Sequence, residues 1–119
     1  MELHLGRRTR RFRVHDWSMA PTFVPGDIIR VTPRTDAEKV PDQGDAIVLR
    51  DPEMKGRKLL KRVQSVMFEG GAVKVFVIGD NPLRSRDSRH FGAVPVEDII
   101  GRVVPTNPSA SRVVRDRFS

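Results

Sequence analysis

A serine in a conformationally restricted stretch is the first candidate for chemistry. Ser18 begins the run SMAPT at 18–22, and VPGD follows at 24–27. Two prolines and a glycine restrict this backbone, which suits a nucleophile because attack requires a fixed position. We expect Ser18 to lie in an exposed turn. Most serines in such turns are cap or turn residues, so the run by itself does not indicate catalysis.

A serine hydroxyl needs a base, and the three histidines are poor candidates. His4 lies among arginines, His15 is only three residues from Ser18, and His90 lies in a polar stretch. No motif supplies the acid that would orient a histidine ring. A lysine can replace histidine where burial in apolar surroundings lowers its pKa.

Lys61 is the lysine whose neighbours suggest burial. The run LLKRVQS covers residues 59–65, and side chains alternate between faces in a strand. Lys61 then shares a face with Leu59, Val63 and Ser65. The alternative is that Lys61 lies at a sheet edge with its amine in water. The pattern leaves both interpretations open.

A polar segment bounded by glycines is the third feature. It reads GDNPLRSRDSRHFG over residues 79–92. Such a segment is ordered only if its short polar side chains bond to the backbone or to each other. Asp87 and Arg89 could pair within it. The alternative is a solvated, charged loop.

Short β-type runs separated by turn residues must position these groups. They cover residues 27–32, 46–50, 58–66, 72–78 and 99–104, with a short first strand at 12–14. Glu69-Gly70-Gly71 predicts a hairpin between two of them. The β-branched enrichment and the lack of a long helical period predict a mainly β, antiparallel domain. One or two short helical turns are expected, one from Ser18 and one at 95–98.

Length and composition restrict the remaining possibilities. The chain has 119 residues, no cysteine and a net charge of +7. This suits one domain and excludes disulfides and cysteine-based metal sites. Three scattered histidines predict no metal site and no cofactor. We expect a basic arm at 1–13, a catalytic domain at 14–105 and a loose tail at 106–119.

The N-terminal residues and the apolar runs also bear on location. The arginine-rich start has no apolar core like that of a signal peptide, and no run is long enough to span a bilayer. We therefore expect a cytoplasmic protein. The basic arm could contact an anionic membrane surface peripherally.

Taken in order, these segments resemble the signal peptidase I family. The SMAPT run resembles its nucleophile box, Lys61-Arg62-Val63 its general-base box, and residues 79–92 its last signature. PGD at 25–27, GD at 44–45 and IGRV at 100–103 continue the likeness. The resemblance covers about residues 14–104. It is strongest to small members such as the nickel-type superoxide dismutase maturation proteases.

The resemblance implies roles for individual residues. Ser18 would attack the scissile carbonyl and Lys61 would be the general base. Ser85 would orient the lysine amine, and Asp87 with Arg89 would form a structural ion pair. The Ser18 backbone N–H would stabilise the oxyanion. The fold would be coiled antiparallel sheets of the type shared with SOS-repressor peptidases. An extended peptide segment of a protein substrate would add a strand beside the site, and its N-terminal leader or propeptide would be removed.

One residue departs from the family pattern. Family members often carry a small hydroxyl residue or glycine two positions before the nucleophile, whereas this chain has Asp16. An ionised carboxylate facing an oxyanion is repulsive. We therefore expect Asp16 to point away, to be protonated, or to have another role.

Two alternative functions remain. An SOS-repressor-type autopeptidase also uses a Ser–Lys dyad, but it carries its own cleavage site upstream of the serine. Only 17 residues precede Ser18, and they contain no Ala-Gly pair. A basic nucleic-acid-binding β domain would use the net charge. The aromatic residues of this chain are too few to interleave with arginines as a stacking surface, so nucleic acid is the less favoured partner.

Overall fold

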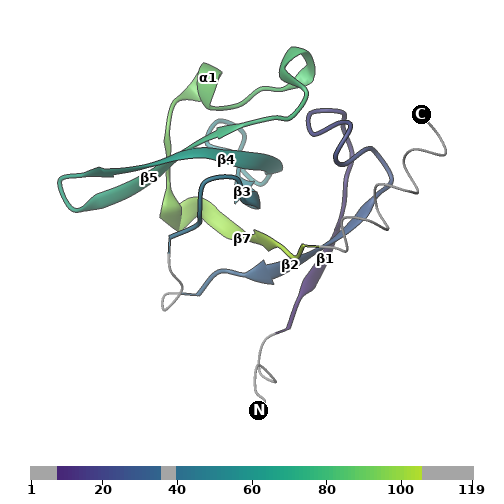
Figure 1. The fold of residues 1–119 in the computed structure, drawn as a ribbon, viewed down its shortest axis with the longest axis horizontal. Coiled ribbons are helices and arrows are strands. Elements are labelled where there is room, and N and C mark those ends of the chain that lie inside the picture. The colour runs from purple at the N-terminus through teal and green to yellow at the C-terminus, as the bar shows by residue number, and fades with distance from the viewer. Residues whose placement is uncertain (1–7, 36–39, 106–119) are drawn as a thin grey trace.

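The strands form a single open antiparallel sheet. The computed structural model describes residues 8–35 and 40–105. Within these ranges the strand order is β1-β2-β7-β3-β4-β5-β6, and every neighbouring pair is antiparallel. The strands are β1 (Arg10–Arg13), β2 (Ile28–Pro33), β3 (Ala46–Arg50), β4 (Lys58–Glu69), β5 (Ala72–Ile78), β6 (Val94–Pro95) and β7 (Ile99–Val103). Figure 1 shows the sheet coiling, so that β1 crosses the end of the molecule away from the β4–β5 hairpin.

The central strand β3 explains why the sheet coils around two cores. Ile47 and Leu49 point into one buried cluster, while Val48 points into the other. A strand covered on both faces is a continuous apolar run, which is what β3 has. The larger cluster lies under β4 and β5. The smaller one lies between β1, β2 and β7.

The β4–β5 hairpin follows the expected pattern and then departs from it. Glu69 pairs with Ala72 across Gly70 and Gly71, whose positive φ angles of 55° and 84° fit a tight two-residue turn. A β-bulge interrupts the register between Val63 and Ser65. Because a bulge adds a residue, it shifts the alternation of side chains.

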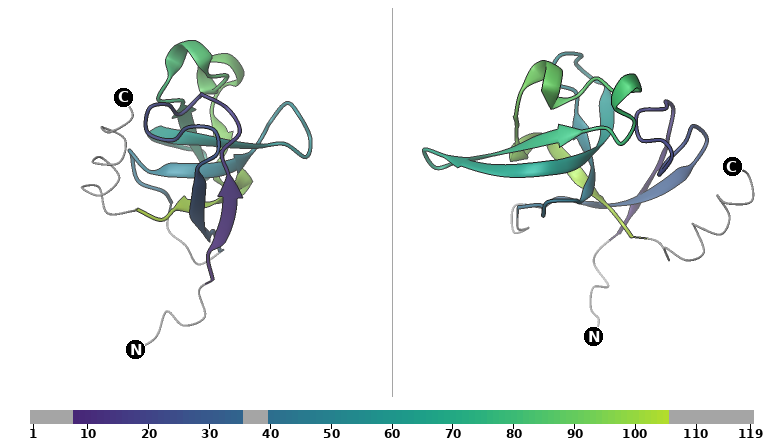
Figure 2. Two further views of the ribbon diagram at one scale, coloured as in Figure 1. Left: turned by 90° about the vertical axis from the view of Figure 1, so that its right-hand side faces the viewer. Right: turned by 45° about the horizontal axis from the view of Figure 1, so that its top comes forward.

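Two loops far apart in the sequence lie side by side. The loop 14–27 connects β1 to β2, and the segment 79–92 follows β5. They are joined by a hydrogen bond of 2.9 Å from the Asn81 backbone N–H to the Ser18 carbonyl oxygen. Figure 2 shows these loops together on the same side of the sheet. Every candidate residue named above lies in these loops or on β4 beside them.

The expectation of a mainly β, antiparallel fold is confirmed. The described part of the chain contains three short helical elements: η1 (Pro82–Arg84), α1 (Ser88–Phe91) and η2 (Val96–Asp98). The turn expected at 95–98 is η2, whereas residues 18–22 form hydrogen-bonded turns rather than a helix. The 79–92 segment, expected as a loop, contains η1 and α1. Across residues 8–35 and 40–105, no helix has the length and hydropathy that a bilayer span needs.

The predicted divisions of the chain fall partly outside the described residues. Residues 1–7 of the basic arm and the tail at 106–119 belong to this undescribed part. Residues 10–13 of the arm form β1, which pairs with β2 in register from Arg10↔Val31 to Arg13↔Ile28.

Candidate active site

The loop that carries Ser18 is closed at its base. The Val14 N–H donates to the Asp27 carbonyl oxygen and the Gly26 N–H donates to the Val14 carbonyl oxygen, both at 2.8 Å. The Ser18 side of this loop packs onto the segment after β5. Ser18 is only 4% exposed, so the expectation of an exposed turn is wrong. The reason is the packing against residues 79–81, which the sequence order does not reveal.

Lys61 lies in the interior of the sheet. It is 2% exposed, and Leu59 and Val63 beside it on β4 are also buried. The expectation that Ser65 shares this face is wrong. The bulge brings Val66 rather than Ser65 onto the core that holds Val63.

The Lys61 amine has a single described hydrogen-bond partner and a lowered pKa. Its Nζ donates to Ser85 Oγ at 3.1 Å. Burial lowers the pKa of Lys61, and the charges of Asp16 and Asp87 oppose this shift without cancelling it. The charges of Arg86 and Arg57 act in the same direction as burial. A lysine whose pKa is lowered by desolvation can lose its proton and serve as a base.

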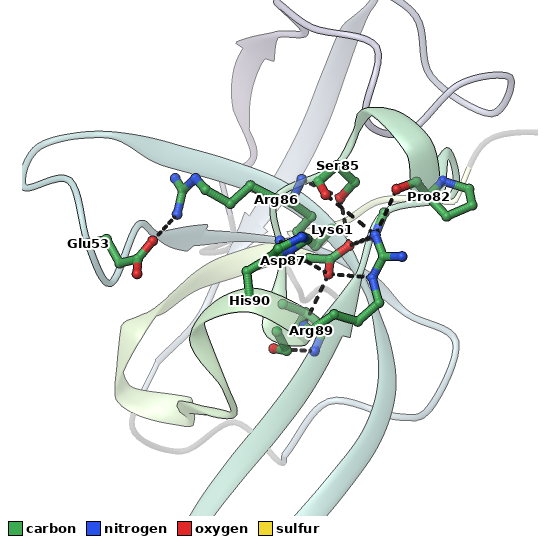
Figure 3. Close-up of polar contacts among 11 residues, drawn as sticks. Glu53, Lys61, Pro82, Ser85, Arg86, Asp87, Arg89 and His90 are labelled. Carbon is green, nitrogen blue, oxygen red and sulfur yellow. Dashed lines mark hydrogen bonds and ion pairs between the residues drawn. The ribbon is translucent and has the colours of Figure 1, made fainter.

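Ser85, Asp87 and Arg89 form a connected hydrogen-bonded chain behind Lys61 (Figure 3). Ser85 Oγ donates to Asp87 Oδ2 at 2.7 Å, and Arg89 Nε donates to Asp87 Oδ1 at 2.9 Å. Because the hydroxyl proton of Ser85 points to Asp87, its oxygen is free to accept from Lys61. The carboxylate therefore fixes the direction of the Ser85 hydroxyl.

Asp87 itself is completely buried and held as an anion. Burial raises the pKa of Asp87, but hydrogen bonds from Arg89, from Ser85 and from the Gly79 and Arg89 backbone outweigh it, so the pKa lies far below its ordinary value. Asp87 also caps α1 by accepting from the Arg89 N–H, while its own N–H donates to His90 Nδ1 at 3.2 Å. His90 is thus a capping residue.

Gly79 lets the two loops approach each other. A Cβ atom built at this position would lie 2.5 Å from the Ser18 carbonyl oxygen and in still closer contact with the Ser85 hydroxyl. The Gly79 N–H donates to Asp87 Oδ2 at 2.8 Å. Gly79 therefore joins the Ser18 loop to the hydrogen-bonded chain behind Lys61, and a larger residue there would separate them.

Asp16 turns toward the nucleophile loop rather than away from it. Its Oδ1 accepts a hydrogen bond of 3.0 Å from the Ser18 backbone N–H. Burial raises the pKa of Asp16, but the hydrogen bonds with the Ser18 backbone and side chain and the charge of Lys61 outweigh it, so the pKa lies below its ordinary value. Asp16 is thus an anion bound to the N–H that was expected to stabilise the oxyanion.

Two further polar clusters support the site and were not predicted. Arg62 binds Asp80 through two hydrogen bonds of 2.8 and 2.7 Å, and Thr22 Oγ1 donates to the same carboxylate at 2.7 Å. This cluster ties β4 to the end of the Ser18 loop. The only sequence signal for this cluster is a basic residue, Arg62, directly after Lys61.

The second cluster joins the turn after β3 to the segment after β5. Arg86 binds the buried carboxylate of Asp51 and also Glu53, the latter at 2.7 Å, as Figure 3 shows for Glu53. Asp51 Oδ1 further accepts from the Glu53 and Met54 N–H groups. Arg86 follows Ser85 directly, so this cluster also fixes the position of Ser85.

A cleft of about 540 Å³ opens beside Ser18. Its walls come from residues 11–16 of β1 and its extension, and from residues 56–60 at the start of β4. β1 is an edge strand, so it offers unpaired backbone groups there. Such a cleft can receive an extended peptide that pairs with the strand edge.

The described residues also bear on a metal site and on the histidines. Within residues 8–35 and 40–105, no three His, Asp or Glu side chains are placed to hold a metal ion. His15 is exposed, and His4 lies outside the described residues. The nucleophile candidate that remains is Ser18, and the base candidate is the buried Lys61.

Comparison with known proteins places the chain in a family. The model of the family described as "Signal peptidase, peptidase S26" matches residues 7–67 and 69–106. The chain belongs to this family. The signal peptidase resemblance seen in the motifs is therefore confirmed.

Two curated relatives show how far the likeness extends. A mitochondrial ATP-independent inner membrane protease subunit 1b of Arabidopsis thaliana is 34% identical over 108 residues, covering 73% of this chain. The chain spans only 63% of that relative's length. A signal peptidase I of Bacillus caldolyticus is 59% identical over 29 residues, which are 24% of this chain and 16% of the relative.

Proposed function

We propose that this chain is a serine endopeptidase in which Ser18 is the nucleophile and Lys61 is the general base. The observation that carries the proposal is the burial of Lys61, whose pKa is lowered and whose amine is held by Ser85 at 3.1 Å. A buried lysine without a direct carboxylate partner is costly for a fold. It is explained if the neutral amine has a chemical task.

The reaction then proceeds through an acyl-enzyme. The Ser18 hydroxyl oxygen forms a bond to the scissile carbonyl carbon while its proton passes to the Lys61 amine. The resulting ammonium gives this proton to the leaving amine as the C–N bond breaks. Lys61 next takes a proton from water, whose oxygen attacks the ester, and the proton returns to Ser18.

Ser85 supports the base by orientation. A neutral amine has two N–H bonds and one lone pair. Donation of one N–H to Ser85 Oγ restricts the direction of the lone pair, and Asp87 keeps Ser85 available as an acceptor. Arg89 balances the charge of Asp87. In this proposal Ser85, Asp87 and Arg89 are positioning residues.

Asp16 must release the Ser18 N–H for that group to stabilise an oxyanion. The hydrogen bond from this N–H to Asp16 occupies the donor, and an oxyanion beside an ionised carboxylate would be repelled. We infer that the Asp16 side chain rotates away when the substrate carbonyl enters.

The substrate of this peptidase would be an extended segment of a protein. It would lie in the cleft along β1, and cleavage would remove an N-terminal leader or propeptide. The Arabidopsis thaliana relative is named as a subunit of an inner membrane protease. A peripheral contact between the basic arm and an anionic membrane is proposed here on charge alone.

Replacing either member of the dyad tests the proposal. Ser18→Ala and Lys61→Arg should each lower kcat by at least about a thousandfold, because no other group takes over the role of the nucleophile or of the base. Arginine retains its proton in proteins and cannot accept one from serine. Cleavage of a peptide with small residues before the scissile bond is followed by mass spectrometry.

The same experiment separates the alternatives. Circular dichroism of each variant must match the parent chain, so that lost activity is not lost structure. Substantial turnover by pure Ser18→Ala would place the nucleophile elsewhere. Cleavage of the chain itself, but of no added peptide, would favour an SOS-repressor-type autopeptidase.

A further inference from the structure

A strongly basic hollow adjoins the Ser18 cleft. It has a volume of about 960 Å³ and is lined by Arg10, Arg34, Arg50, Lys55, Arg57 and Lys58. We call these six residues and the space between them the basic hollow. It shares Gly56, Arg57 and Lys58 with the cleft beside Ser18. The two spaces therefore border the same turn before β4, and together they are called the groove.

Three of the six basic side chains have no carboxylate partner among the described residues. Asp51 and Glu53 also line the hollow, but both bind Arg86. Glu97 and Asp98 lie at the other end of the hollow. Among the described residues, no carboxylate within ion-pair distance faces Arg34, Lys55 or Lys58.

One local feature is a cost that an anionic ligand would relieve. Arg50 and Lys58 stand directly opposite each other on β3 and β4. Like charges in such a cross-strand pair destabilise a sheet. A bound carboxylate would relieve this repulsion.

We propose that the basic hollow binds an acidic segment of the protein substrate, located several residues from the scissile bond. This rests on the proposed function, because it assigns the hollow to the same bound chain that enters the Ser18 cleft. A peptide rises by about 3.3 Å per residue when extended. Acidic side chains several residues from the scissile bond would thus lie beyond the turn at 56–58.

An acidic peptide suits this groove better than other anions. Nucleic acid binding without sequence preference uses aromatic side chains for stacking, and none lines the hollow. The undescribed tail at 106–119 carries three arginines and one aspartate. Like charge disfavours this tail as an occupant.

Binding to the Ser18→Ala protein tests the proposal without cleavage. The probes are three labelled peptides with the same alanine-rich centre: one with Glu at three positions before it, one with Glu at three positions after it, and one with Gln throughout. We expect one acidic peptide to bind about tenfold more tightly than the Gln peptide, from a few partly screened charge pairs. Equal binding of all three peptides overturns the proposal.

Charge reversals locate the site. In the Ser18→Ala background, Lys55→Glu should weaken the acidic peptide about threefold or more. Lys74 lies on β5 outside both spaces. Lys74→Glu makes the same change of net charge and should not weaken binding of the acidic peptide. Lys58→Glu should weaken binding without lowering Tm, since it places opposite charges across from Arg50. Equal effects of Lys55→Glu and Lys74→Glu overturn the proposal.

Two further outcomes are informative. Tighter binding of a 12-nucleotide single strand than of either acidic peptide would assign the hollow to nucleic acid and overturn the proposal. The active protein is assayed in parallel on the Gln peptide. Cleavage of that peptide without an acidic preference would refute the hollow's role while leaving the Ser–Lys peptidase intact.

Discussion

Lys61 is a lysine placed where folded proteins rarely tolerate one. Its side chain is buried among apolar residues of β4, and its amine contacts a hydroxyl rather than a carboxylate. Burial lowers the pKa of Lys61, and two nearby carboxylates limit the shift. The balance between burial and these charges decides at which pH the base is available.

Asp16→Asn tests how much the charge of Asp16 opposes the effect of burial on the pKa of Lys61. The substitution removes a negative charge that raises the pKa of Lys61, while the amide oxygen can still accept from the Ser18 N–H. The Lys61 pKa should fall further, so the rise of kcat/KM should move to lower pH. The measurement is kcat/KM against pH for both proteins.

Asp42→Asn is the matched control for that substitution. Asp42 is exposed and is not among the main charges that shift the pKa of Lys61. Asp42→Asn changes the net charge by the same amount as Asp16→Asn and should not move the profile of kcat/KM against pH. An unmoved profile in Asp16→Asn would show that the Asp16 charge does not reach the base.

At the scale of elements, the site depends on the approach of two loops. The Ser18 loop and the segment after β5 meet at Gly79, where the Ser18 carbonyl oxygen and the Ser85 side chain leave no space for a Cβ atom. The Arg62–Asp80–Thr22 cluster joins the same two segments. The proposed dyad therefore depends on loop packing and not on a single strand.

Gly79→Ala should therefore disrupt the site more than the fold. The added methyl must push Ser18 or Ser85 away, and displacements of about 1 Å can cost a hundredfold in rate. Gly71→Ala is the control, because it strains a positive φ in the hairpin by about 1 kcal/mol without any close neighbour. Both proteins should lose some Tm, but only Gly79→Ala should lose kcat. Full activity of Gly79→Ala would argue against this assembly.

The sequence predicts the strands better than it predicts their contacts. Alternation in β4 correctly places Lys61 with Leu59 and Val63, because hydrophobic pattern and period are local properties. The bulge that displaces Ser65 has no clear local signal. The partners of Asp80 and Asp51 depend on which loops meet, so Arg62 and Arg86 could not be assigned from their neighbours. Asp16 stood out only by its departure from the family pattern.

At the scale of the whole molecule, the buried Lys61 lowers the stability of the fold. The pKa of Lys61 is lower in the folded state than in the unfolded chain, so the unfolded chain binds this proton more tightly. The free energy of unfolding therefore rises with pH between the folded and the unfolded pKa of Lys61. Below the folded value the full cost is present.

Lys61→Met should make the protein more stable and inactive. Methionine fills a similar volume without a charge, and removing a buried cost of this kind commonly yields about 1–2 kcal/mol. For a chain of this size the gain corresponds to a rise in Tm of several degrees. Thermal unfolding at pH 7 and at pH 10 measures it. The gain should shrink at the higher pH, and a lower Tm at pH 7 would contradict the assignment of Lys61 as a destabilised base.

The central claim is that a neutral lysine activates Ser18, and the pH dependence of kcat/KM tests it most directly. For the parent chain on a peptide with small residues before the scissile bond, we predict one ascending limb. Its midpoint should lie above that of a free histidine, about 6.5, and below that of a free lysine, about 10.4. The limb should keep its position in His15→Gln. A midpoint near 6.5 that disappears in His15→Gln would show that histidine is the base and would contradict the account.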